Sequence, residues 1–410
     1  MRTILVVGDG MADRPLKELG GRTPLEAAET PNLDSVAKAG VCGLMDIIAP
    51  GRPPGSDVAN LALLGYDPIE SYRGRGALEA MGAGIEIRRG DVAFRGNFSY
   101  VDDRGVVLDR RAGRVEGSQF KGHLSDVRLS GHPDVEVTVL PTLGHRLAVV
   151  LRGEKLSWRV SDTDPHRDGA KVLTSQPLEK TEEAERTAAI VNKLTATLKN
   201  MLRDDPVNRE RIKAGLPPAN AILLRGAGEP PTVTPMTDLY GVRGACVSAT
   251  PTVRGACVAV GFEIFDALGA TGGVDTDTIS KARKAEEVLP NHDIVYLHVK
   301  GTDNASHDGK AQLKMSVIEK IDDMVGHLIE HADLDETYIA VTADHTTSVT
   351  ARDHRGDPVP VAISGPEVRS DAVASFSERA CAYGGLGRIR GKELMPTLLD
   401  LLGKMPLYGS

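Results

Sequence analysis

The stretch Asp293-Ile294-Val295-Tyr296-Leu297-His298-Val299, followed shortly by Asp303, decides the expected fold. Two other apolar runs also lead to an acid: residues 3–7 lead to Asp9, and residues 338–342 lead to Asp344. Short apolar runs rich in β-branched residues are typical of parallel strands buried on both faces. In an open α/β sheet the carboxyl ends of such strands face the ligand crevice. We therefore expect an α/β protein with a mainly parallel sheet flanked by helices, and with three acids at one edge of it.

The composition narrows the classes of partner. The chain has 410 residues, more than one ordinary domain, and 41% of them are hydrophobic, so it can bury a substantial core. Six Phe, eight Tyr and one Trp are too few for a base-stacking surface, and we expect no nucleic-acid partner. Because the net charge is −8, an anionic substrate needs local arginines or metal ions to bind.

The cysteines and the apolar segments indicate the compartment. The four cysteines are widely spaced and form no Cys-x-x-Cys, which disfavours a thiolate zinc site or a disulfide framework. The first apolar run ends too early for a signal peptide, and no apolar stretch approaches the roughly 18 residues that suggest a membrane span. We expect a cytoplasmic protein without a membrane partner, and the sequence leaves a homo-oligomer open.

Local patterns place the secondary structure along the chain. Thr30 is expected to cap a helix that starts at Pro31, and Ser56 to open another short helix. The near-repeat of residues 242–247 at 253–258 is too short for a repeat fold, and we interpret it as two packed strand-like segments. Further elements are expected as follows: strands at 92–98 and 221–224, helices at 181–202 and 313–329.

The same patterns suggest two domains. Gly-rich turns and alternating stretches begin near Gly74, and Pro/Gly-rich segments flank residues 221–224. The simplest arrangement is a discontinuous core of residues 1–75 and 231–410, interrupted by an inserted α+β domain of residues 76–230 that covers the substrate.

The residues after the strands suggest a metal cluster. Asp303 and His307 are four apart and share a helical face, Asp344 and His345 directly follow a strand, and His354 comes nine residues later. Oxygen and nitrogen ligands without thiolates favour Mn²⁺, Zn²⁺, Mg²⁺ or Co²⁺, and imidazole disfavours a purely Mg²⁺ site. Any one of these residues alone is more often a helix cap or a hydrogen-bonded surface group. Together they favour metal binding.

Ser56 is the candidate nucleophile. It follows Pro53-Pro54-Gly55 at the start of a helix, where backbone N–H groups and the helix dipole favour a phosphate or a phosphoserine. The local sequence fits an ordinary N-cap serine equally well, and both interpretations stay open. A metal-bound serine needs no histidine base, because coordination lowers the pKa of the hydroxyl.

The motifs taken together resemble the alkaline phosphatase superfamily, and within it the archaeal-type branch of the cofactor-independent phosphoglycerate mutases. The resemblance runs through nearly the whole chain. It rests on the following stretches: residues 6–13, 30–34, 55–59, 73–76, 300–303, 307–310, 342–345 and 384–391.

This resemblance implies an alkaline-phosphatase-like core with two divalent metal ions, Mn²⁺ as first choice and Zn²⁺, Co²⁺ or Mg²⁺ as alternatives. One ion matches Asp303, His307 and His354 as ligands. The other matches Asp9, Asp344 and His345, and it also contacts Ser56. The implied reaction interconverts 2- and 3-phosphoglycerate through a phosphoserine, without 2,3-bisphosphoglycerate. The substrate is then a small phosphorylated metabolite.

Arginines are expected to hold the substrate's carboxylate and phosphate, because guanidinium gives bidentate contacts that lysine cannot. The candidates in or near the insertion are Arg75, Arg95, Arg110, Arg111, Arg146, Arg225 and Arg254. Two rival functions remain: a phosphatase or phosphotransferase, for example homoserine-kinase-like, acting on another small phosphate ester, and a catalytically silent metal-binding or scaffold protein. The complete ligand set beside a serine disfavours the silent protein.

Overall fold

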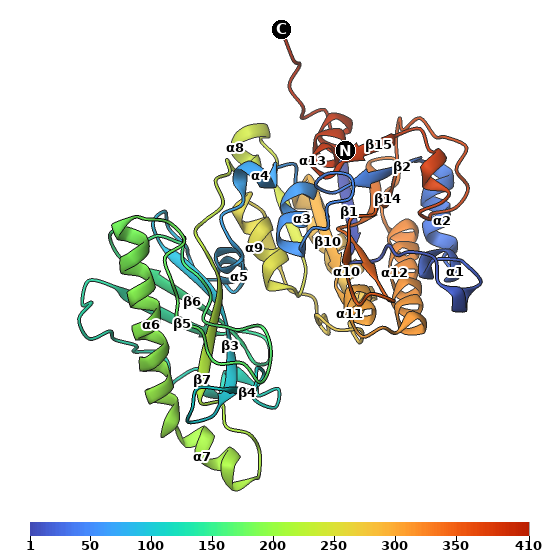
Figure 1. Cartoon of the computed structure of the whole chain (residues 1–410). Helices are drawn as coiled ribbons and strands as arrows, with labels where there is room; N and C mark the ends of the chain where they lie inside the picture. The colour runs from blue at the N-terminus through green and yellow to red at the C-terminus, as the bar shows by residue number, and fades with distance from the viewer. Residues whose placement is uncertain (410) are drawn as a thin grey trace. The chain divides into compact units, whose positions relative to one another are not determined.

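The computed structural model describes residues 1–409, which form two compact units. The core unit comprises Met1–Tyr72 and the chain from Val233 onward, and the inserted unit comprises Arg73–Thr232 (Figure 1). The sequence placed the insertion at residues 76–230. The inserted unit starts earlier and ends later because its two ends pair with each other: the Glu229 N–H donates to the Arg73 carbonyl at 2.9 Å.

An eight-stranded, mainly parallel sheet forms the centre of the core unit, in the order β15-β2-β14-β11-β1-β10-β8-β9. Strand β14 runs antiparallel to both its neighbours, β11 and β2, whereas the other strand pairs of this sheet within the described residues are parallel. The three central strands are buried along almost their whole length, as the unbroken apolar runs predict. The strands are β1 (Arg2–Gly8), β2 (Val41–Asp46), β8 (Gly244–Val247), β9 (Glu263–Phe265), β10 (Ile294–Val299), β11 (Thr337–Ala343), β14 (Val359–Ser364) and β15 (Gly387–Arg390).

Helices cover this sheet in two layers (Figure 1). One layer contains α2 (Pro31–Ala39), α10 (Thr278–Val288) and α12 (Ala311–His331), and the other contains α3 (Ser56–Leu63), α9 (Pro251–Ala259) and α13 (Gly391–Leu401). The predicted α/β fold with a helix-flanked, mainly parallel sheet is confirmed. The short elements are α1 (Pro24–Ala27), α4 (Pro68–Ser71), α8 (Met236–Tyr240), α11 (Gly301–His307), β12 (Thr346–Ser348) and β13 (Asp353–Arg355). No helix within residues 1–409 is long and apolar enough to cross a bilayer.

The inserted unit is built on an antiparallel five-stranded sheet, as its alternating stretches predict. The long helix α6 begins at the Thr181 cap, whose hydroxyl accepts from the Ala184 N–H, and buries its apolar face against the unit's core. The elements are α5 (Arg75–Gly82), β3 (Val92–Val101), β4 (Val107–Asp109), β5 (Glu136–Pro141), β6 (Arg146–Arg152), α6 (Glu182–Arg203), α7 (Pro206–Lys213) and β7 (Ala221–Gly228).

One local prediction is wrong, and another is confirmed only in part. The near-repeat does not form two strands, because residues 244–247 are β8 whereas residues 253–258 lie in α9, which starts at Pro251. A proline at the first helical position favours the helix, and tertiary packing overrides the shared sequence. Helix α2 begins at Pro31 and Thr30 is its N-cap residue, as predicted, but the Thr30 side chain makes no cap hydrogen bond. Instead the Asp322 carboxylate on α12 accepts from the Asn32 and Leu33 N–H groups at 2.9 and 2.8 Å.

Candidate metal centre and nucleophile

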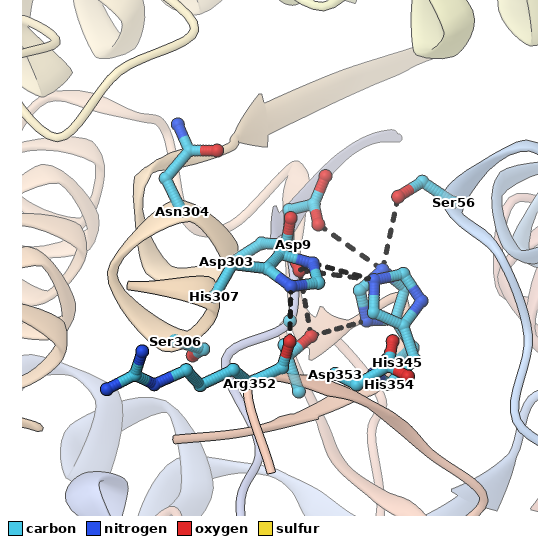
Figure 2. Close-up of polar contacts among 12 residues, drawn as sticks. Asp9, Ser56, Asp303, Asn304, Ser306, His307, His345, Arg352, Asp353 and His354 are labelled. Atoms are coloured by element: carbon cyan, nitrogen blue, oxygen red, sulfur yellow. Dashed lines mark hydrogen bonds and ion pairs between the residues drawn. The ribbon is translucent and has the colours of Figure 1, made fainter. Parts of the chain in front are cut away.

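The three predicted strand-end acids lie together because their strands are neighbours. Strand β1 pairs in parallel with β10 on one side and with β11 on the other. Their carboxyl ends therefore bring Asp9, Asp303 and Asp344 to the same edge of the sheet. All three are buried, with at most 2% of their surface exposed. Figure 2 shows Asp9 and Asp303 there, with the three predicted histidines and Ser56 around them.

Asp303, His307 and His354 point their donor atoms at one another. Asp303 Oδ1 lies 3.3 Å from the Nε2 atoms of both histidines, and these two nitrogens are themselves 3.3 Å apart. Each histidine uses its other nitrogen on a backbone carbonyl: His307 Nδ1 donates to Arg352 O at 2.8 Å, and His354 Nδ1 donates to Pro54 O at 2.7 Å. A carbonyl only accepts, so Nδ1 of each ring carries a proton, and in the neutral imidazole Nε2 is the nitrogen that offers a lone pair.

His345 lies between this group and the two other acids. Its Nε2 is 3.3 Å from Asp9 Oδ1 and 3.6 Å from Asp344 Oδ1, and its ring stacks on His354 with centroids 3.8 Å apart. The Thr347 hydroxyl donates to Asp303 Oδ1 at 2.9 Å, so it accepts from His345 Nδ1, also at 2.9 Å. In the neutral ring, His345 Nε2 is therefore the nitrogen that offers a lone pair, and the hydrogen bond to Thr347 on β12 orients the ring.

Ser56 opens α3 beside this second group. Its Oγ lies 3.1 Å from His345 Nε2, and only 5% of the residue is exposed. Gly55, not Ser56, occupies the N-cap position, so the ordinary N-cap interpretation is wrong. Asn60, one turn later, donates to both the Ser56 carbonyl and Asp344 Oδ2, at 2.7 and 3.0 Å. The first turn of α3 is thereby tied to the carboxylate at the end of β11.

Sequence reasoning missed Lys300, which the structure places among the acids. Its Nζ lies 3.0 Å from an Asp9 oxygen, 2.6 Å from Asp303 Oδ2 and 3.5 Å from Ser56 Oγ. Burial is the largest single influence and opposes ionisation of Asp9 and Asp303, but the Lys300 ammonium and the hydrogen bonds from neighbouring histidines together hold the pKa of both carboxyls below the usual range. Its position between a strand end and Asp303 was the available signal, because a residue there faces the same crevice.

His298 was missed for a different reason. It is the sixth residue of the quoted apolar stretch, and the pattern suggested only a strand interior. In the structure its Nε2 lies 3.1 Å from Asp9 Oδ2 and neither side chain is exposed. Asp9, His298 and Asp344 offer ligand atoms within 4.8 Å of one another, as do Asp303, His345 and His354. His298 is therefore an additional candidate ligand or a partner that orients Asp9.

The donor set fits divalent cations. Within residues 1–409, three buried carboxylates lie around the Lys300 ammonium, which leaves a negative excess in a poorly hydrated place. The Nε2 atoms of His307 and His354 also lie 3.3 Å apart, a spacing that suits two ligands of one ion. Burial and the neighbouring Asp9 charge raise the pKa of Asp344, so this carboxyl in particular needs a cation to stay ionised.

Five of the candidate arginines form a cluster within the inserted unit. Arg95 on β3 lies opposite Arg225 on the neighbouring strand β7. On the other side of β3, Asn97 lies opposite Arg146 on β6. Arg75 and Arg95 share one carboxylate, because a nitrogen of each lies 3.2 Å from Glu79 Oε1. Arg110 and Arg225 share the carboxylate of Asp164, at 2.6 and 4.0 Å. Burial lowers the pKa of Arg95 and Arg225, and the other arginines lower it further.

The remaining two candidates lie apart from those shared ion pairs. Burial is the main cause that lowers the pKa of Arg146, and the positive charge of Arg111 helps to lower it further. The Arg111 backbone N–H donates to Asp109 Oδ1 at 2.8 Å. Arg254 belongs to the core unit, on α9, where its guanidinium binds Asp266 and the Ser248 carbonyl. Clustered guanidinium groups with so few carboxylates are typical of an anion site.

Known proteins resemble this chain over its full length. A model of the 2,3-bisphosphoglycerate-independent phosphoglycerate mutase family matches residues 37–208. The chain is 48% identical over 416 residues to the 2,3-bisphosphoglycerate-independent phosphoglycerate mutase of Ignicoccus hospitalis, and 45% identical over 412 residues to enzyme 1 of that name from Methanocaldococcus jannaschii. Each alignment covers 100% of this chain and 99% of the relative.

A solved structure agrees with these sequence relatives. A Pyrococcus horikoshii protein, 36% identical, matches with a TM-score of 0.85 over 100% of this chain and 99% of its own. The resemblance seen in the motifs is thus confirmed across both units. The chain belongs to the archaeal-type family of 2,3-bisphosphoglycerate-independent phosphoglycerate mutases.

Proposed function

We propose that this mutase interconverts 2- and 3-phosphoglycerate through a phosphoserine on Ser56, at a centre that binds two divalent metal ions. One observation carries the proposal: Ser56 Oγ lies at a helix start, 3.1 Å from a histidine nitrogen of the ligand group and within reach of Lys300. A serine there accepts a phosphoryl group where backbone N–H groups and a cation face it.

The proposed ligands are Asp303, His307 and His354 for one ion, and Asp9, Asp344 and His345 with Ser56 for the other. When bound, the two ions neutralise the phosphoryl oxygens and lower the pKa of the serine hydroxyl. Mn²⁺ is the first choice because it accepts both carboxylate and imidazole, and Zn²⁺, Co²⁺ and Mg²⁺ are alternatives.

The chain's own residues do the remaining work. Ser56 Oγ forms a bond to phosphorus as the bond from phosphorus to the substrate oxygen breaks, and the reverse transfer gives the phosphoryl group to the other glycerate hydroxyl. The Lys300 ammonium, 3.5 Å from Ser56 Oγ, is positioned to bind the transferred group. Asn60 keeps the first turn of α3 against Asp344, so the nucleophile keeps its orientation.

We further propose that the inserted unit covers the substrate and supplies its anion clamp. The support is chemical: Arg75, Arg95, Arg146 and Arg225 share few carboxylates, and a phosphoglycerate brings both a carboxylate and a phosphate. A phosphoserine open to water would hydrolyse, and a mutase therefore needs a cover.

The test is an assay of the purified chain with Mn²⁺ and 3-phosphoglycerate, without 2,3-bisphosphoglycerate, that follows 2-phosphoglycerate and free phosphate in parallel. We expect 2-phosphoglycerate with little free phosphate, and acid quenching should trap phosphate on the peptide that contains Ser56. Free phosphate as the main product would indicate a phosphatase. Phosphate trapped on another residue, or none trapped at any time, would refute the Ser56 route.

A further inference from the structure

Outside the catalytic centre, helices α10 and α12 bring three metal-binding side chains together. Glu286 comes from α10, and His327 and His331 come from the last two turns of α12, which lies beside α10 (Figure 1). The three side chains offer ligand atoms that all lie within 4.8 Å of one another. Two histidines four apart on a helix face the same side, so this arrangement follows from the spacing and the helix packing.

The contact between Glu286 and His327 is not an ordinary hydrogen bond. Glu286 Oε1 and His327 Nε2 are 3.3 Å apart, yet both atoms are shielded from solvent and neither has a hydrogen-bond partner within residues 1–409. Zinc binds nitrogen and oxygen at about 2.0–2.2 Å, which in a tetrahedral site separates two such ligand atoms by roughly 3.4 Å. The observed spacing therefore suits two ligands of one ion.

A backbone contact fixes which nitrogen of His331 carries the proton. Its Nδ1 lies 2.8 Å from the His327 carbonyl, which only accepts, so Nδ1 carries the proton and the Nε2 lone pair is free. The two imidazole rings stack with centroids 4.1 Å apart and planes 26° apart. His331 is exposed, whereas the other two side chains are partly buried, so the group opens to solvent on one side.

This group is separate from the proposed catalytic centre. Near the start of α12, Lys314 contacts the Ala12 and Thr347 carbonyls close to that centre. His327 lies 13 residues further along the helix, or roughly 20 Å at 1.5 Å per residue. An ion pair between Glu286 and His327 and a helix-end position for His331 explain each residue singly. They do not explain why three donor atoms converge.

We propose that Glu286, His327 and His331 form a further metal site, which takes a divalent transition-metal ion of the zinc class. Two imidazole nitrogens and one carboxylate oxygen supply three ligands, and water completes the shell on the exposed side. The ion links α10 to α12, two helices that cover the same face of the core sheet. It therefore stabilises the folded core unit at a distance from the reaction.

The test is equilibrium dialysis of the full chain against Zn²⁺, followed by metal analysis. The variants are His327→Gln with His331→Gln, the isosteric Glu286→Gln, and the matched control Glu287→Gln, whose carboxylate pairs with Lys284 at the surface. We expect the double variant to lose one equivalent of zinc relative to the wild type, Glu286→Gln to bind that equivalent at least about tenfold more weakly, and Glu287→Gln to match the wild type.

Two further readouts separate this site from the catalytic centre. Zinc should raise the unfolding temperature of the wild type more than that of the double variant, because an ion that binds only the folded state stabilises it. His354→Ala should leave this zinc-dependent difference in place. Equal zinc stoichiometry and equal zinc-dependent stabilisation in the wild type and in a folded Glu286→Gln protein would overturn the proposal. The catalytic assignment would be unaffected.

Discussion

Ser56 Oγ and His345 Nε2 lie 3.1 Å apart, although 289 residues separate them in the chain. The serine opens α3, whereas the histidine follows β11, and the buried carboxylate of Asp344 joins the two through Asn60. The proposed nucleophile is thus placed directly beside the proposed ligand group, at the start of a helix. This relationship makes the role of Ser56 open to a direct test.

Ser56→Ala should reduce mutase activity by at least about 10³-fold, because it removes the proposed phosphoryl acceptor. The metal content should stay the same, since the carboxylate and imidazole ligands remain. The measurement combines the 2-phosphoglycerate assay with metal analysis of the same sample. Ser71→Ala, at the end of α4, serves as the control and should stay active. Substantial turnover by a metal-replete Ser56→Ala protein would rule out the nucleophile assignment.

His354→Ala should lower the number of bound divalent ions by about one, since its Nε2 faces Asp303 and His307. After chelation, Mn²⁺ or Co²⁺ should restore more wild-type activity than Ca²⁺, because Ca²⁺ prefers oxygen-only shells. Metal analysis after dialysis checks the first point, and activity recovery checks the second. His132→Ala in the inserted unit is the matched control. Unchanged metal number and affinity in His354→Ala would exclude this ligand.

Arg225→Met should raise the KM for 3-phosphoglycerate by about 10- to 100-fold, the range expected for losing a hydrogen bond to a charged group. Arg225 is chosen because its Nε is 4.0 Å from Asp164, whereas Arg110 already binds that carboxylate at 2.6 Å. Arg128→Met removes an exposed guanidinium paired with a neighbouring surface acid, and it should leave KM unchanged. If both variants behaved alike, the arginine cluster would not contact substrate.

Lys314→Met should destabilise the core unit by about 3–5 kcal/mol, because it leaves the buried Asp13 carboxylate without its cation. Lys314 Nζ lies 3.0 Å from Asp13 Oδ2, and neither side chain is exposed. Lys310→Met breaks the pair with Asp308, in which both side chains are 60% exposed, and should cost about 0–1 kcal/mol. Urea unfolding of the two variants measures the difference. Similar losses in both would contradict the argument from burial.

The inserted unit should lose stability in acid partly through His145. Burial lowers the pKa of His145 to about 4, and the nearby Arg146, Arg111 and Arg95 charges add to the shift, opposed by Asp109. Because the folded pKa lies below the ordinary value of about 6.5, the unfolded chain binds the proton first. Folding stability therefore falls as the pH drops through about 6.5, and this contribution levels off near pH 4.

His145→Gln tests this effect because it removes the titrating group. Urea midpoints measured from pH 7.5 to 4 should fall less steeply in the variant than in the wild type. Parallel curves for the two proteins would show that His145 does not titrate differently on folding.

Much of the core and of the candidate centre followed from local pattern. A fully buried strand needs an unbroken apolar run, and parallel strands end at a common edge, so the positions of Asp9, Asp303 and Asp344 could be predicted. The four-residue spacing of His307 from Asp303 places both on one face of α11. These features depend on residues close in sequence, and the regular repeat of a helix or strand determines which face each of them is on.

The remaining features were decided by tertiary structure. The position of Lys300 between two acids, the burial of His298 against Asp9 and the capping of α2 by Asp322 all join residues about 290 apart, which no local period specifies. The two copies of Val-Arg-Gly-Ala-Cys-Val became a strand and a helix for the same reason. The local sequence by itself determined the central strands and the edge where the acids meet. Packing decided which side chains meet there, because the direction of a side chain depends on what the fold places against it.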